Sequence, residues 1–121
     1  MRNLVRVVVP AALLLIAASP AVEARLEPAF KGTVVSTYPD GRTGHLWLNR
    51  DGTYTGEGRR RKPSSGRWSV EGDQLCLKQK KPFPGPFAYC TPLPPGNSTW
   101  TAKAVTGEPI TLRVIPGGRK S

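Results

Sequence analysis

Short stretches in which apolar and polar residues alternate follow one another along most of the chain. Alternation with a period of two places the apolar side chains on one face of a β-strand. Asp40-Gly41, Asp51-Gly52 and Gly72-Asp73 separate several of these stretches. Glycine reaches positive φ without a Cβ clash, so such pairs favour tight hairpin turns. The predicted strands cover residues 32–38, 44–49, 53–58, 67–71, 74–79, 87–91, 99–105 and 109–115.

Sequential antiparallel strands of this kind must close or stack, because an open sheet exposes unpaired edges. We therefore expect an all-β fold: a small antiparallel up-and-down meander of about eight strands forming a lipocalin-like barrel. A two-sheet β-sandwich is the alternative. Trp68, Tyr54 and Trp100 are expected to fill most of a narrow interior. The alternation predicts these inward-facing residues: Leu46, Leu48, Tyr54, Trp68, Val70, Leu75, Leu77, Phe87, Tyr89, Trp100, Ala102, Ile110, Leu112 and Val114.

The N-terminal residues have the composition of a signal peptide. Arg2 and Arg6 precede an apolar run at residues 7–18, and small residues follow it. The run is too short to span about 30 Å of hydrocarbon. We predict a cleaved signal peptide at residues 1–24 and a periplasmic or secreted, monomeric domain at residues 25–121. That domain has no transmembrane span, no helix-period segment, and a flexible tail from about residue 116.

Cys76 and Cys90 are the two cysteines of the chain. Two cysteines in an exported protein usually form one disulfide. Cys76 lies between Leu75 and Leu77 and so faces away from them, and Cys90 is likewise opposite Tyr89. A bond between neighbouring strands would fix their register across a proline-rich bend. The spacing matches neither a C-x-x-C redox pair nor a zinc site, so we predict a structural disulfide and no metal.

Several of these residues together resemble a known pattern. It occurs in small exported proteobacterial proteins that are grouped as domains of unknown function with lipocalin-like barrels. The resemblance covers roughly residues 32–91; it implies a fold and a compartment but no activity. The residues that carry it are Asp51-Gly52-Thr53, Gly66, Trp68, Gly72-Asp73, Leu75-Cys76-Leu77 and Tyr89-Cys90.

The sequence offers little for catalysis. His45 is the single histidine, and the aspartates Asp40, Asp51 and Asp73 lie in predicted turns, where they form local hydrogen bonds. No carboxylate pair is placed for acid–base chemistry. We therefore predict a non-enzymatic protein without a cofactor.

Positive charge is the most distinctive surface property. The chain has a formal net charge of +10 at pH 7, which favours anionic partners. Arginine binds phosphate and similar groups through forked donors, although such a loop can also serve only solubility. Nucleic acid is disfavoured by the export signal. The candidate anion-binding residues are Arg59, Arg60, Arg61, Lys62, Arg67, Lys78, Lys80 and Lys81.

Three further residues are candidates for a protein interface. Trp47 should face outward beside His45, where it either anchors a partner or covers a barrel end, and Phe83 lies in the stiff proline loop. The leading hypothesis is an exported cell-envelope protein that contacts an anionic component through its basic loop. The alternatives are a proteinaceous inhibitor of a secreted hydrolase and a carrier of a small apolar ligand.

The signal-peptide hypothesis predicts that exported protein begins near Arg25. Intact mass spectrometry of the exported material measures this directly. A mass that still includes residues 1–24 would contradict it.

Overall fold

The computed structural model describes residues 19–117 except residue 97. Most of the predicted signal peptide, residues 1–18, and the last part of the predicted tail, residues 118–121, lie outside the described residues. The described elements are α1 (Pro20–Phe30), β1 (Gly32–Thr37), β2 (Thr43–Leu48), β3 (Thr53–Glu57), β4 (Pro63–Glu71), β5 (Gln74–Lys81), β6 (Tyr89–Pro92), β7 (Trp100–Lys103) and β8 (Pro109–Pro116).

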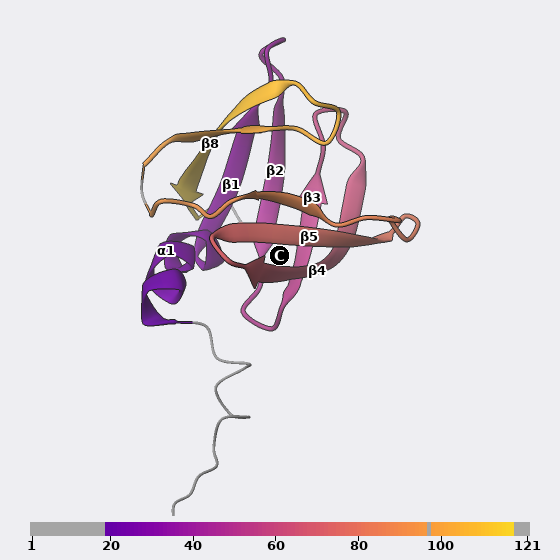
Figure 1. The fold of residues 1–121 in the computed structure, drawn as a ribbon. Helices are drawn as coiled ribbons and strands as arrows, with labels where there is room; N and C mark the ends of the chain where they lie inside the picture. The colour runs from indigo at the N-terminus through magenta and orange to yellow at the C-terminus, as the bar shows by residue number, and fades with distance from the viewer. Residues whose placement is uncertain (1–18, 97, 118–121) are drawn as a thin grey trace, which may run out of the picture.

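The eight strands form one antiparallel sheet that curves into a nearly closed barrel (Figure 1). The all-β prediction is confirmed, and the strand order is β6-β5-β4-β3-β2-β1-β8-β7. The first strand in the chain, β1, pairs along its whole length with the last, β8, from Gly32 opposite Pro116 to Thr37 opposite Thr111. The sheet ends at β6 and β7, which are consecutive in the chain but not paired. We call the gap between these two strands the seam.

A short helix, α1, packs at one end of the barrel (Figure 1). Ser19 caps it by accepting a hydrogen bond from the Val22 backbone N–H at 3.2 Å. Leu26 and Ala29 are fully buried in the core, and the Arg25 guanidinium donates to two backbone carbonyls of the loop that follows β6. The prediction that no helix follows residue 24 is therefore wrong, and the predicted cleavage position lies within α1.

The direction of each strand fixes which loops share an end of the barrel. The end beside α1, which we call the closed end, holds the core residues Leu26, Leu48, Leu75 and Leu93. Trp68 also belongs there, because its indole N–H donates to the Asn49 carbonyl at 2.7 Å. The opposite end, which we call the open end, is formed by loops 38–42, 58–62, 82–88 and 104–108.

Most of the predicted inward-facing residues belong to the core or pack against it. Phe87 is an error, since its residue is 82% exposed in the loop before β6. The predicted strand included this residue because it stands two positions before Tyr89. In the structure the strand begins only at Tyr89.

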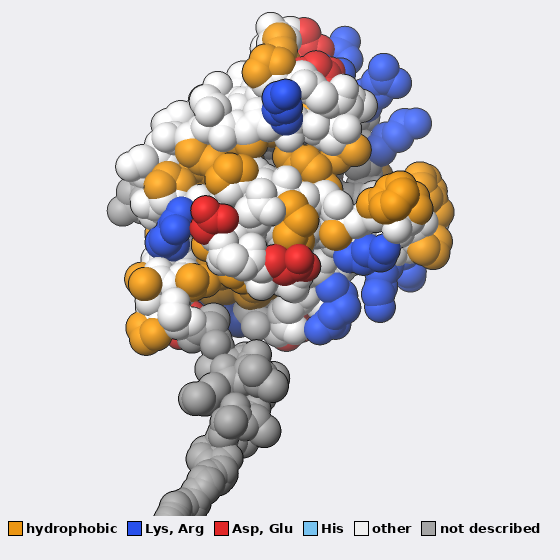
Figure 2. All heavy atoms as spheres, in the orientation of Figure 1, with side chains coloured by type: hydrophobic (Ala, Val, Ile, Leu, Met, Phe, Trp, Pro, Cys, Tyr) orange, Lys and Arg blue, Asp and Glu red, His pale blue; other side chains and the backbone are white. Residues whose placement is uncertain are grey.

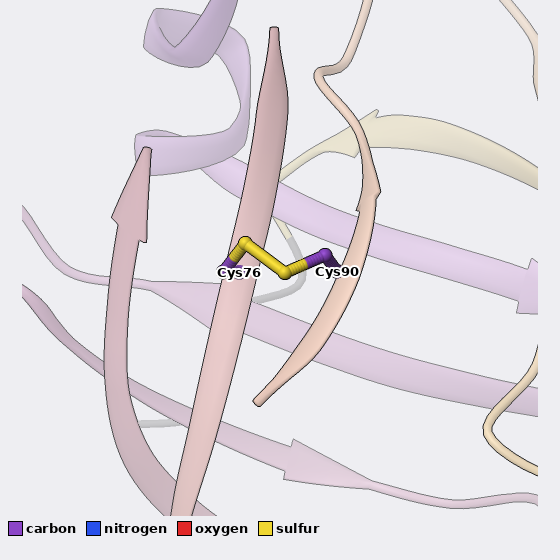
Figure 3. The surroundings of a disulfide bond; sticks show 2 residues. All are labelled: Cys76 and Cys90. Atoms are coloured by element: carbon purple, nitrogen blue, oxygen red, sulfur yellow. A yellow bond between two sulfur atoms is a disulfide. The ribbon is translucent and has the colours of Figure 1, made fainter. Parts of the chain in front are cut away.

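The predicted disulfide is present between β5 and β6 (Figure 3). Cys76 and Cys90 are register partners with a Cα–Cα distance of 4.0 Å. Cys76 is almost fully buried. The bond therefore ties a short edge strand to the body of the sheet.

Replacing both cysteines with alanine should lower the free energy of unfolding by about 3 kcal/mol, because a loop of about 15 residues is no longer closed in the unfolded chain. Urea unfolding followed by tryptophan fluorescence measures the difference. Reduced wild-type protein is the control and should match the variant to within about 1 kcal/mol. A variant as stable as the oxidised protein would contradict the prediction.

Candidate functional site

The barrel contains a cavity of about 770 Å³ that opens at the open end. Its walls include apolar side chains from the inner face of the sheet, among them Leu46, Leu77 and Leu112. Trp68 and Trp100 do not line it. Tyr54, the third aromatic residue expected to fill the interior, is buried and lines the cavity. The expectation that these three residues together fill most of the interior is therefore wrong for the half of the barrel away from α1.

Three exposed apolar side chains surround the mouth of this cavity. Phe83 and Phe87 in the β5–β6 loop are 62% and 82% exposed, and Val105 in the β7–β8 loop is 80% exposed. All three line the cavity. They are the large hydrophobic residues that the described part of the chain leaves most exposed. Large exposed apolar groups gathered in one place usually mark an interaction site.

Basic residues lie at the same end. Arg60 and Lys62 are exposed in the β3–β4 loop, and Lys80 and Lys81 are exposed at the end of β5. Figure 2 shows the β5–β6 loop as a projecting group of hydrophobic side chains with Lys and Arg on both sides. Within the described residues these four cations form no ion pair. We call Arg60, Lys62, Lys80 and Lys81 the rim cations.

Two other members of the predicted basic loop are engaged within the protein. Arg59 lies 2.6 Å from Glu108 and 3.6 Å from Asp40, and its guanidinium stands 4.5 Å from the centre of the Tyr38 ring. It therefore joins three loops of the open end. Arg61 adopts a φ of 63° and donates to His45 Nδ1 at 3.0 Å.

The remaining basic candidates lie apart from this loop. Arg67 pairs in register with Thr53, at the start of β3, and its guanidinium lies beside Gly52. The structure thus places Arg67 near the closed end, away from the rim cations. Lys78 reaches toward the open end and donates to the Pro86 carbonyl at 3.3 Å.

Trp47 faces outward from the barrel, as the alternation predicts, but its predicted exposure is wrong. The residue is 5% exposed. Its indole N–H donates to Thr33 Oγ1 at 2.9 Å, and that hydroxyl donates to the Gly117 carbonyl at 3.0 Å. The His45 ring stacks on it at 5.9 Å. Of the three interface candidates, only Phe83 is strongly exposed.

The described residues contain no group of three His, Cys, Asp or Glu side chains that would hold a metal ion. Asp40 and Asp51 accept hydrogen bonds from backbone N–H groups two residues further on, as predicted for turn residues. No helix in residues 19–117, apart from residue 97, is long and apolar enough to span a membrane.

The chain matches no protein-family model, no curated protein and no solved structure. The resemblance to exported lipocalin-like domains therefore stays a prediction.

The contacts of Glu108 predict a pH-dependent stability. A hydrogen bond from Thr106, a second bond from a backbone N–H and the Arg59 guanidinium hold the pKa of this carboxyl below its usual value of 4.5. A lowered folded-state pKa stabilises the protein above the unfolded pKa, and this stabilisation is lost as the pH falls through the folded value. Glu108→Gln should therefore be less stable than wild type at pH 7, and the difference should shrink below about pH 4.5.

Urea unfolding at a series of pH values measures this difference. Glu71→Gln, at an exposed glutamate that forms no ion pair among the described residues, is the matched control. A Glu108→Gln difference that stays constant down to pH 3 would refute the role of the carboxylate.

Proposed function

We propose that the protein binds an anionic membrane surface at the cell envelope through the open end of its barrel. The observation that carries this proposal is the position of Phe83, Phe87 and Val105 beside the rim cations. Neither group alone is informative, since single exposed apolar residues and solvated lysines are common. Their combination at one end of a small protein supports a surface that is both anionic and apolar beneath its charge.

The electrostatic part of this interaction comes from the rim cations. Each Lys or Arg near an anionic leaflet contributes about 1 kcal/mol. The acidic side chains at the same end are matched by other cations, because Asp40 pairs with Arg42 and Arg59, and Glu108 pairs with Arg59. Glu57 lies 4.0 Å from His45. The open end therefore presents unpaired positive charge rather than a balanced mixture.

The apolar part comes from the loop tips. Phenylalanine rings enter the boundary between headgroups and acyl chains, and stable attachment takes two such contributions together. The β5–β6 loop is rich in proline, with Pro82, Pro84 and Pro86 around its two phenylalanines. Proline restricts φ, so less conformational freedom is lost when this loop is held at a surface.

Removing the charges of Arg60 and Lys62 tests the proposal. The Arg60→Ser/Lys62→Ser protein should bind phosphatidylglycerol vesicles about 30-fold more weakly at low salt, because two contributions of about 1 kcal/mol are lost. Binding is measured by co-sedimentation. Stability should change by less than about 0.5 kcal/mol per site, since both residues are exposed.

The matched control is Arg67→Ser/Arg113→Ser, which removes the same net charge from exposed residues elsewhere on the barrel. It should bind nearly as well as wild type. A third variant, Phe83→Ser/Phe87→Ser, should bind more weakly while keeping the salt dependence. The proposal fails if wild-type protein does not prefer phosphatidylglycerol over phosphatidylcholine vesicles, or if the two charge variants bind equally.

A further inference from the structure

We infer that the barrel cavity binds the hydrocarbon chain of a single-chain anionic amphiphile, with the anionic headgroup at the mouth. This site goes beyond surface attachment, because it lies inside the barrel and holds one molecule. Its volume of about 770 Å³ falls in the range of roughly 300–1,000 Å³ that is usual for small-molecule sites. Barrels of eight strands have just enough interior for one small ligand.

The space exists because small residues stand on the inner face of neighbouring strands. Gly44 lies opposite Ser36, and Gly56 lies between Leu46 and Ser64 in the register of the sheet. A Cβ on Gly56 would come within 3.1 Å of the His45 carbonyl oxygen. A large side chain at either position would occupy the volume that now opens to the mouth.

The chemistry of the wall changes from the closed end to the mouth. The apolar wall is formed by Val34, Leu46, Leu77 and Leu112, and the buried core around α1 occupies the other end of the barrel. A cavity with an apolar wall inside the barrel and an opening among the loops suits a ligand with one apolar end. Burying each methylene group of such a chain is favourable.

The mouth supplies a cation for the other end of the ligand. Lys103 is the last residue of β7 and borders the cavity at its mouth. It follows Ala102 and so starts on the outer face of the strand, from which its long side chain extends at the open end. It is exposed and forms no ion pair within the described residues. Its backbone carbonyl accepts a hydrogen bond from the Tyr89 hydroxyl across the seam. This contact holds the strand end in place while the ammonium group remains available. A carboxylate or phosphate headgroup complements that charge, and the rim cations add to it.

The first experiment uses cis-parinaric acid, whose fluorescence rises on entry into an apolar site. Wild-type protein should bind one molecule per chain. Ala102→Phe places a ring on the inner face of β7, where Ala102 lines the cavity, and should weaken binding by about tenfold or more because several methylene groups lose their site. Thr101→Phe adds the same ring to the exposed outer face of the same strand and should bind as wild type does.

A second blocking variant guards against a folding defect in the first. Ser36→Phe fills the cavity from β1, and both variants are checked for a wild-type circular dichroism spectrum and for the intact disulfide. Displacement of the probe by oleate and by oleoyl-lysophosphatidylglycerol distinguishes a free fatty acid from a lysophospholipid as the source of the chain. Lys103→Gln should weaken oleate binding and leave oleyl alcohol binding unchanged.

The inference is overturned if wild-type protein does not bind the probe, or if folded Ala102→Phe and Ser36→Phe bind it as tightly as Thr101→Phe. The vesicle assay separates this result from surface attachment. Ala102→Phe should still sediment with phosphatidylglycerol vesicles, because the rim cations and Phe83 are unchanged. Wild-type protein that binds the probe but does not bind phosphatidylglycerol vesicles would instead refute the surface proposal alone.

Discussion

The pairing of β1 with β8 is the interaction on which the rest of the structure depends. It joins segments that are far apart in the sequence, as shown by the Thr33 hydroxyl, which donates to a carbonyl 84 residues away at Gly117. The two strands approach so closely that a Cβ on Gly32 would lie 2.3 Å from the Ile115 carbonyl oxygen. Only glycine fits there. Without this pairing the hairpin of β7 and β8 would separate from the other six strands, and the remaining sheet would enclose no interior.

Once the sheet is curved, α1 decides which end of the barrel is filled. Leu26 and Ala29 complete the core at the closed end, and no corresponding element covers the other end within the described residues. The cavity, the exposed aromatic residues and the unpaired cations therefore all lie at the open end. The Arg59 contacts with Asp40 and Glu108 hold its loops together while leaving the mouth accessible.

The strands and the disulfide could be predicted from the sequence because both depend on the pattern of neighbouring residues. Alternation identifies the face of each side chain, and Cys76 and Cys90 fell on one face of neighbouring strands. Alternation does not give the height of a residue within the barrel, so it could not show that Trp68 lies near the closed end. Nor does it show what covers the outer face, and Trp47 is buried there by contacts that include Thr33 and His45.

Two further features could not be predicted, because both depend on long-range contacts. Helix α1 has only 11 residues and contains Pro28, so its pattern is weak, and its burial depends on a barrel that the sequence does not display. Arg59 and Arg60 are neighbours with the same chemistry. Arg59 differs from Arg60 because loops 38–42 and 104–108 fold against it and supply Asp40 and Glu108 as its ion-pair partners.

The seam has a consequence for how copies of this protein behave beside one another. Unpaired strand edges are templates for aggregation, and natural sheets protect them with short edge strands, prolines and lysines. Both edge strands here have four residues, and β6 ends at Pro92. The part of β5 that β6 does not cover carries Lys80 and Lys81. In the same part, the Gly85 backbone N–H donates a hydrogen bond to the Gln79 carbonyl. An open barrel can thus keep its mouth accessible to a ligand without offering a long edge on which a second chain could add a strand.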